Sequence, residues 1–222
     1  MPFRKLILAL VAASGFHAGA FAGSTKADFA GVHPSWAVRS VANWVVKAND
    51  NGNAAFFVID KRNARLYVFN PGGQLQGTAP ILLGLARGDD SVPGIGEKPL
   101  AAIRPAERTT PAGRFVAERG RNAQGEDVVW VNYADAISLH RVRTLDAKER
   151  RPERLRTPSA ADNRISYGCI NVPVDFYNRT VERAWGSGGV VVYVLPESKS
   201  LGEVFPPRPS FVTTAALVRR MG

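Results

Sequence analysis

The residues with the clearest chemical meaning lie in the stretch Ser166-Tyr167-Gly168-Cys169-Ile170-Asn171, which holds the single cysteine of the 222-residue chain. Because Gly168 has no side chain, a substrate carbonyl can approach the backbone there without meeting a Cβ atom. The amides of Gly168 and Cys169 could then stabilise a developing oxyanion. A free thiol is only slightly ionised near neutral pH, so attack by Cys169 requires a base. The stretch therefore predicts acyl transfer at a cysteine nucleophile.

Three histidines are present, and His140 is the natural partner for the thiol. His17 falls in an N-terminal targeting segment and His33 precedes the first expected helix. His140, in contrast, ends the apolar run Ala136-Ile137-Ser138-Leu139, which is typical of a strand that directs its last side chain into a site. An imidazole can accept a thiol proton near neutral pH. Zinc is not indicated, because His140 and Cys169 alone do not fill a tetrahedral site.

The first 22 residues are typical of a secretory signal. Arg4 and Lys5 give a positive start, residues 6–11 begin an apolar stretch, and Ala20-Phe21-Ala22 provides a cleavage pattern. The apolar stretch is too short for a spanning helix of about 20 residues. We therefore expect an exported chain, in the periplasm or cell envelope, with no membrane span after signal removal. In such an oxidising compartment a lone thiol is a liability unless it is buried, paired or used.

The chain is strongly basic, with 29 Lys and Arg against 19 Asp and Glu and a formal net charge of +10. This charge favours anionic partners through long-range attraction, although it serves general solubility equally well. Export argues against nucleic acid, and no nucleic-acid-binding fold is indicated. An anionic envelope polymer or a carboxylate-rich peptide suits the predicted compartment better.

The elements that must position these residues are mostly short strands. A helix is expected over 33–50, with Ser35 as N-cap and with Trp36 and Trp44 packed on the main domain. Runs rich in β-branched and aromatic residues predict strands at 55–60, 65–70, 81–85, 114–118, 128–133, 136–140 and 190–195. Short strands joined by turns favour a β-sandwich or a barrel-like core.

Two longer segments lack a strand pattern. Residues 84–112 contain four prolines that rule out a long helix, so this segment is interpreted as a lid or a local insertion. Residues 141–164 carry eight basic side chains, Arg141, Arg143, Lys148, Arg150, Arg151, Arg154, Arg156 and Arg164. This second segment is interpreted either as a solvated insertion or as a rim that binds carboxylates, since arginine pairs with them in a bidentate way.

The motif Ser166-x-Gly168-Cys169-Ile170-Asn171, with His140 upstream, resembles the catalytic domain of L,D-transpeptidases (the YkuD family). The element Thr110-Pro111-Ala112-Gly113-Arg114-Phe115 supports the resemblance independently, as do the runs 57–60 and 65–69, which are similar to that domain's first hairpin. The resemblance implies a mainly β fold, namely an L,D-transpeptidase-like β-sandwich of mixed sheets with a few short helices.

The resemblance covers roughly residues 55–195, and residue patterns divide the rest of the chain around it. A signal peptide is expected over 1–22 and an N-terminal helical extension over 23–54. The L,D-transpeptidase-like catalytic domain would occupy 55–195. A Pro-rich C-terminal extension would follow over 196–222, with a short helix from Thr213.

By this resemblance, Cys169 attacks the carbonyl between the third and fourth residues of a peptidoglycan stem peptide, and terminal D-alanine leaves. An amine from a second stem peptide, or from an envelope protein, resolves the thioester, with His140 as the base. Gly168 and Cys169 would supply oxyanion amides, while Ser166 and Asn171 would hold the loop or contact substrate. No metal and no organic cofactor are implied.

The chain departs from the family pattern at two places. Tyr167 stands where the family usually has histidine, and a phenol is not a base near neutral pH. Tyr167 is therefore interpreted either as a packing aromatic or as a change in acceptor choice. Arg141 follows His140 in place of a small residue, and 141–165 is longer than the family's usual gap. Arg141 and Arg164 are accordingly candidates for binding substrate carboxylates.

Two functions other than transfer are compatible with the same residues, namely hydrolysis and non-catalytic binding. Resolution of the thioester by water would make the chain an L,D-carboxypeptidase or endopeptidase that hydrolyses stem peptides. A non-catalytic peptidoglycan-binding module on the same fold is the third alternative, and the presence of both Cys169 and His140 argues against it.

Overall fold

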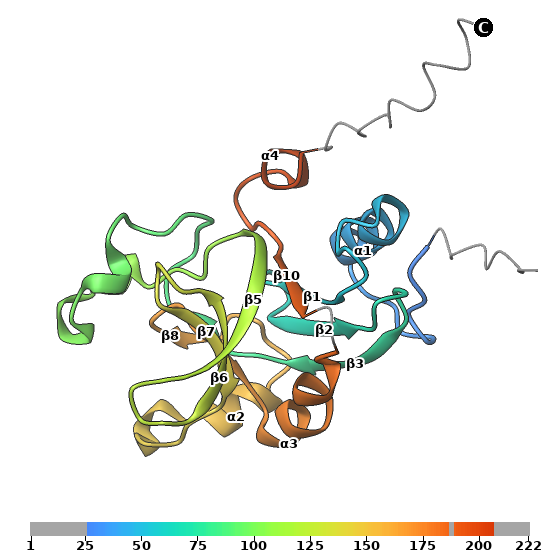
Figure 1. Cartoon of the computed structure of the whole chain (residues 1–222). Helices are drawn as coiled ribbons and strands as arrows, with labels where there is room; N and C mark the ends of the chain where they lie inside the picture. Colours follow the sequence, from blue (N-terminus) through green and yellow to red (C-terminus); the bar gives the residue numbers. More distant parts are fainter. Residues whose placement is uncertain (1–25, 187–188, 207–222) are drawn as a thin grey trace, which may run out of the picture.

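The computed structural model describes residues 26–186 and 189–206 (Figure 1). The predicted signal peptide over 1–22 and the predicted helix from Thr213 lie outside the described residues, and the expected boundaries at 54 and 195 stay predictions. Within the described ranges, no helix has the length and apolar character that crossing a membrane requires.

Eight strands form one mixed sheet in the order β3-β2-β1-β10-β5-β6-β7-β9. Strands β1 and β10 run parallel, as do β7 and β9, and the other neighbours are antiparallel. The bounds are β1 Ala55–Asp60, β2 Arg65–Phe69, β3 Leu75–Pro80, β5 Gly113–Arg121, β6 Asp127–Asn132, β7 Ile137–Arg141, β9 Ile170–Val172 and β10 Val190–Val194. A separate parallel pair joins β4 (Leu83–Gly84) to β8 (Arg164–Ser166).

The long strand β5 is shared by the two halves of the sheet. Its residues 113–117 pair with β10, and its residues 118–121 pair with β6. The far edges of the sheet meet at Leu82 and Asn171, whose backbones exchange two hydrogen bonds of 2.9 Å. The sheet is thereby nearly closed into a barrel-like sandwich (Figure 1). The predicted mainly β fold, with mixed pairing and a few short helices, is confirmed.

The central strand β1 is buried on both faces, which explains its unbroken apolar sequence. Phe57 and Ile59 belong to a core between the two halves of the sheet. Phe56 and Val58 belong to a second core that is covered by α1 (Trp36–Ala48). The alternation of side chains along β1 therefore supplies both cores at once.

Helix α1 confirms the helix expected over 33–50. The Ser35 hydroxyl accepts a hydrogen bond from the Val38 N–H, and the left-handed conformation of Asn49 (φ 49°) ends the helix. Trp44 packs against the second core as expected. Trp36 does not, because 69% of it is exposed at the start of the helix.

The remaining helices are short. They are α2 (Arg151–Arg156), α3 (Val174–Phe176), which continues through a π-helical turn and a 3-10 turn to Ala184, and α4 (Leu201–Val204). Residues 84–112 form three 3-10 turns, over 95–97, 100–102 and 105–107, and no long helix, as their prolines predict. Figure 1 shows this segment, in green, projecting from one side of the sheet.

Candidate active site at Cys169

Cys169 lies immediately before β9, beside β7. The parallel register pairs His140 with Asn171, which places Cys169 next to Ser138. The Ser138 N–H and O–H point to the Cys169 sulfur at 3.5 and 3.6 Å, and the sulfur lies 3.6 Å from the Ala136 carbonyl. The cysteine is free and partly exposed. The thiol is thus reachable from solvent, and a thiolate at this position could accept hydrogen bonds from both Ser138 donors.

Ser138 is a site residue that the sequence motifs do not indicate. Successive side chains of a strand point to opposite faces, so Ser138 and His140 share one face of β7. Ile137 and Leu139 occupy the other face and pack into the core between the two halves of the sheet. This alternation is the signal in the sequence that could have identified Ser138 as a neighbour of the thiol.

His140 is held in one tautomer by the backbone. Its Nδ1 lies 2.7 Å from the Arg141 carbonyl oxygen. Because a carbonyl can only accept, Nδ1 carries the hydrogen and Nε2 keeps the lone pair that a base requires. Burial lowers the pKa of His140, which the hydrogen bond to the Arg141 carbonyl opposes and the nearby charges of Arg143 and Arg151 reinforce. His140 is therefore neutral near pH 7.

The imidazole and the thiol share a face of the sheet without a hydrogen bond between them. In the described part of the chain, the hydrogen-bonding contacts of the Cys169 sulfur go to Ser138 and Ala136 alone. Catalytic hydrogen bonds are often long or poorly aligned before substrate binds. A proton transfer from Cys169 to His140 would accordingly require the two side chains to come within hydrogen-bonding distance of each other.

Ser166 and Asn171 hold the loop that carries Cys169. The Ser166 hydroxyl accepts a hydrogen bond from the Gly168 N–H at 3.1 Å and donates to the Cys169 carbonyl at 2.6 Å. The Asn171 amide donates to the same carbonyl at 3.3 Å. Both residues are almost fully buried. Of the two roles expected for them, holding the loop agrees with these contacts.

The contact with Ser166 also corrects the expected role of Gly168. Its N–H is already bonded to the Ser166 hydroxyl, so it is not available to an oxyanion in this structure. Gly168 is required for another reason. It has φ +129°, and a Cβ there would lie 2.7 Å from Ile137 Cδ1 and 2.8 Å from the Thr109 carbonyl oxygen. Only glycine fits this conformation and this space without strain.

Thr110 fixes the same loop from the segment before β5. The Thr110 side chain is fully buried, and its hydroxyl accepts from the Gly84 N–H at 2.9 Å and donates to the Gly168 carbonyl at 2.7 Å. The Thr110-Pro111 element was expected only as a supporting motif. Its threonine has a positioning role, because it ties the residue before Cys169 to β4.

A buried ion cluster lies behind Thr110. The Lys61 ammonium donates to the Thr110 carbonyl at 2.9 Å and to Asp89 at 2.8 Å, with both ionic side chains at 0% exposure. Arg164 donates to both carboxylate oxygens of Glu197, at 3.2 and 2.6 Å, and to the Lys61 carbonyl at 2.8 Å. Arg164 is therefore held by structural contacts, and its binding of a substrate carboxylate stays a prediction that these contacts do not support.

Arg141 is likewise occupied by other parts of the chain. Its guanidinium donates to both oxygens of Asp127 at 2.9 Å, to Glu182 at 2.6 Å and to Asn178 at 2.7 Å. The same group lies 4.2 Å from the centre of the Tyr177 ring. These contacts occupy the guanidinium, but Arg141 also lines the groove beside His140, so its binding of a substrate carboxylate stays a prediction.

The Arg-rich segment 141–164 is in part a support of the site. Arg151 donates to the Asn171 side-chain oxygen at 2.5 Å and to Glu149 at 2.6 Å. Since Asn171 holds the Cys169 carbonyl, Arg151 helps to fix the loop that carries Cys169. The expected alternative, a solvated insertion, does not describe this arginine.

Tyr167 lies beneath an arginine from the segment 84–112. The guanidinium carbon of Arg108 is 3.8 Å from the centre of the Tyr167 ring, within the range of a cation–π interaction. The sequence motifs do not point to Arg108. Its role becomes visible only when the segment 84–112 and the nucleophile loop are placed side by side.

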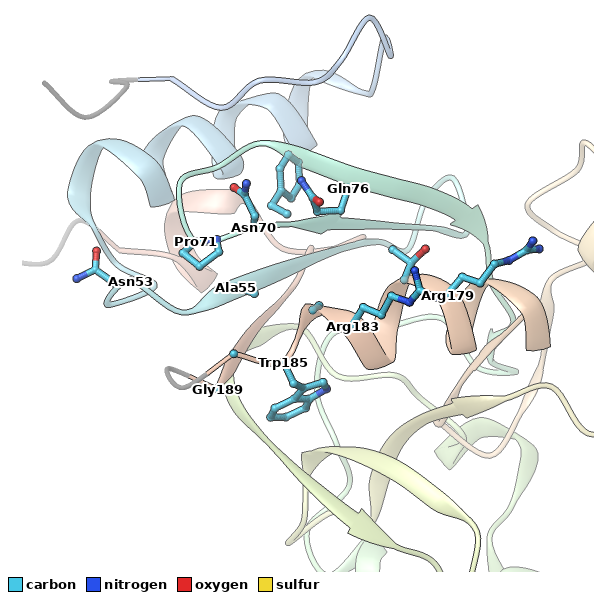
Figure 2. Close-up of a pocket in the computed structure, with 13 residues that line it drawn as sticks. Asn53, Ala55, Asn70, Pro71, Gln76, Arg179, Arg183, Trp185 and Gly189 are labelled. Carbon is cyan, nitrogen blue, oxygen red and sulfur yellow. The ribbon is translucent and has the colours of Figure 1, made fainter. Parts of the chain in front are cut away.

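A groove of about 410 Å³ runs beside His140. It is lined by Glu126, Asp127, His140, Arg141, Val142, Arg143, Thr144, Leu145 and Val174. A second hollow, of about 480 Å³, lies between the β2–β3 turn and the helical segment 174–184, with Asn70, Arg179 and Arg183 in its walls (Figure 2). It includes neither Cys169 nor His140. In the described ranges, no three His, Cys, Asp or Glu side chains gather as a metal site requires.

Comparison with known proteins gives distant similarities only. No protein-family model and no curated protein matches the chain. Among solved structures, an L,D-transpeptidase from Xylanimonas cellulosilytica is 15% identical, with a TM-score of 0.39, over 64% of this chain and 60% of that one. The helical cell shape determining protein Pgp2 from Campylobacter jejuni is 18% identical, with a TM-score of 0.41, over 66% and 49%.

The catalytic domain of the E. faecium L,D-transpeptidase is 17% identical, with a TM-score of 0.35, over 64% of this chain and 98% of that one. The chain spans about half to three fifths of the Pgp2 and Xylanimonas structures. At such identities and TM-scores, the proposals that follow rest on the residues of this chain.

Proposed function

We propose that this chain is a cysteine acyltransferase that acts on peptidoglycan stem peptides through a thioester at Cys169, in crosslinking or remodelling of the cell wall. The observation that carries the proposal is the shared face of Ser138, His140 and Cys169. On this face a partly exposed thiol lies beside two donors, together with an imidazole whose Nε2 has no hydrogen-bond partner among residues 26–186 and 189–206. The motif around Cys169, with its upstream Thr110 element, supports the peptide substrate.

The first half-reaction follows from these groups. The thiol proton passes to His140 Nε2 as the sulfur attacks the carbonyl between the third and fourth residues of the donor peptide. The tetrahedral intermediate collapses, the C–N bond breaks, and His140 returns the proton to the leaving D-alanine amine. The product is a thioester at Cys169.

The second half-reaction needs a nucleophile that reaches both the thioester and His140. The groove beside His140 provides room for an acceptor peptide, with the ring of His140 in its wall. The acceptor amine loses a proton to His140 as it attacks, and the sulfur takes that proton as it leaves. If water takes the place of the amine, the same steps hydrolyse the donor, and the chain is an L,D-carboxypeptidase.

One experiment tests the proposal and decides between its two outcomes. The purified protein is incubated with disaccharide-tetrapeptide, and the products are analysed by mass spectrometry. Crosslinked dimers indicate transfer, whereas tripeptide without dimers indicates hydrolysis. Cys169→Ser and His140→Gln should both abolish the product, and a carbapenem should add its mass to the wild-type Cys169 alone. A folded wild-type protein that gives neither product nor adduct overturns the proposal.

A further inference from the structure

Arg108 and Tyr167 form a rigid pair beside the nucleophile loop. The guanidinium lies over the Tyr167 ring at 3.8 Å, and its Nε and Nη2 both donate to the Ile103 carbonyl, at 3.3 and 3.2 Å. One contact fixes the face of the planar group and the other fixes its edge. The direction of the remaining nitrogen, Nη1, is therefore set by the fold.

The backbone of Arg108 is anchored equally firmly. Its carbonyl oxygen accepts from the Ala86 N–H at 3.0 Å and packs so closely on Gly84 that a Cβ would collide with it. The next carbonyl, that of Thr109, packs against Gly168, where a Cβ would come within 2.8 Å. Residues 108 and 109 thus lie directly against the loop that presents Cys169.

The positive charge of Arg108 is not balanced within the described chain. Arg104 and Lys98, on the same segment, both pair with Glu107, at 2.9 and 2.8 Å. In the ranges 26–186 and 189–206, Arg108 makes no ion pair, and its Nη1 has no hydrogen-bond partner. A guanidinium that is held still and has no acidic partner is suited to binding an anion from outside the chain.

We propose that Arg108, oriented by Tyr167, binds a substrate carboxylate next to the bond that Cys169 attacks. The identity of the ligand rests on the proposed function, in which the donor ends in a carboxylate one residue beyond the attacked carbonyl. The anion site itself does not depend on that function. Tyr167 then has a specific use, because a neutral aromatic ring attracts the cation, whereas a protonated histidine in its place would repel it.

The anion site is tested first with two small reagents that alkylate Cys169. Iodoacetate and iodoacetamide form the same C–S bond and release the same iodide, but only iodoacetate carries a negative charge. Second-order rates are measured by mass spectrometry for the wild type, Arg108→Gln and Arg104→Gln. The iodoacetate-to-iodoacetamide ratio should fall roughly five- to tenfold in R108Q, as expected for loss of one partly screened charge. It should stay unchanged in R104Q, which removes an exposed arginine from the same segment.

The second test identifies the ligand. Donor tetrapeptides with a free C-terminal carboxylate and with a C-terminal amide are compared by kcat/KM. The wild type should prefer the free carboxylate by about tenfold or more, and R108Q should lose this preference. Arg108→Lys should keep part of the iodoacetate preference, since it keeps the charge, yet turn over the free-carboxylate donor more slowly, because it lacks the stacked planar group.

The outcomes separate this inference from the proposed function. Equal turnover of the two donors by the wild type overturns the inference even if R108Q does not fold. An unchanged alkylation ratio in a folded R108Q overturns it as well. If the ratio depends on Arg108 but no donor reacts, the anion site stands and the proposed function fails.

Discussion

The Thr110 hydroxyl donates a hydrogen bond of 2.7 Å to the carbonyl of Gly168, the residue directly before the nucleophile. The same oxygen accepts from the Gly84 N–H, so one buried hydroxyl joins three separate segments. The position of Cys169 is therefore set in part by a residue that is itself fully buried.

Replacing Thr110 by Val should loosen this arrangement. The change keeps the shape of the side chain but leaves the Gly84 N–H and the Gly168 carbonyl without a partner, which costs about 1–3 kcal/mol of unfolding free energy. We expect slower carbapenem acylation of Cys169 in addition. Thr110→Ser keeps the hydroxyl and should retain most of the unfolding free energy and most of the acylation rate. Urea denaturation and acylation rates measure the two effects, and a T110V protein equal to wild type in both would contradict the role.

Gly168→Ala should be among the most damaging small substitutions in the chain. A Cβ there meets Ile137 and the Thr109 carbonyl, and the backbone has φ +129°. We expect a loss of about 2–4 kcal/mol of unfolding free energy from strain and overpacking together. Gly125→Ala is the matched control, because Gly125 also has a positive φ (+79°) but no atom within 4 Å of its Cβ position. A loss in G168A no larger than in G125A would show that packing at this position is unimportant.

His140 should make the stability of the protein depend on pH. Because burial lowers its pKa from 6.5, the folded chain binds fewer protons than the unfolded chain as pH falls below that value. Its contribution is fully present above about pH 6.5 and is lost as pH falls through the lowered pKa. Unfolding free energies measured from pH 8 to pH 5 should therefore fall more for wild type than for His140→Gln.

The exposed His33 provides the control for this measurement. His33→Gln is the matched substitution, because it removes an exposed histidine that lies outside β7 and the loop of Cys169. If H140Q and H33Q give the same pH dependence, His140 is not held neutral by the fold, and its assignment as the base loses its electrostatic support.

The buried pair of Lys61 and Asp89 should be costly to break from one side. Lys61→Met removes the charge that Asp89 faces at 2.8 Å, in a place where neither side chain is exposed. Leaving one charge buried without its partner costs about 3–5 kcal/mol. Arg87→Met is the comparison, because Arg87 pairs with Glu197 while its own side chain is 66% exposed, and about 1 kcal/mol or less is expected. Chemical denaturation measures the unfolding free energy of both variants. Equal losses in the two would argue against a structural role for the buried cluster.

The local sequence pattern predicts those strands that are long enough to show a run of β-branched and aromatic residues. Strands β1 and β10 are continuous runs of β-branched and aromatic residues, and both were predicted within a residue of their bounds. Strand β3 was missed, because Gly77 and Pro80 interrupt its pattern and its pairing with β2 holds it in place. Strands β8 and β9 have three residues each, which is too short for periodicity to distinguish them from loop.

The residues of the candidate site also fall into two groups, those that the sequence indicates and those that only the folded chain brings together. Residue type and scarcity identified Cys169 and His140, because a thiol and an imidazole have few other uses in such a chain. Charge alone does not reveal that Arg141 and Arg164 pair with carboxylates of the chain itself, since a sequence does not show which carboxylate a folded arginine will meet. The partner of Arg164 is Glu197, and that of Tyr167 is Arg108, both from distant segments. Such contacts arise only from the three-dimensional course of the chain.

The two backbone hydrogen bonds between Leu82 and Asn171 have a consequence for the order of folding. They close the sheet where the segment after β3 meets β9, the strand that follows Cys169, so Cys169 lies beside a contact between two segments far apart in the chain. Contacts between such distant parts of a chain form late. We therefore expect the proposed reactivity of the Cys169 thiol only in a chain whose sheet has closed at these two hydrogen bonds.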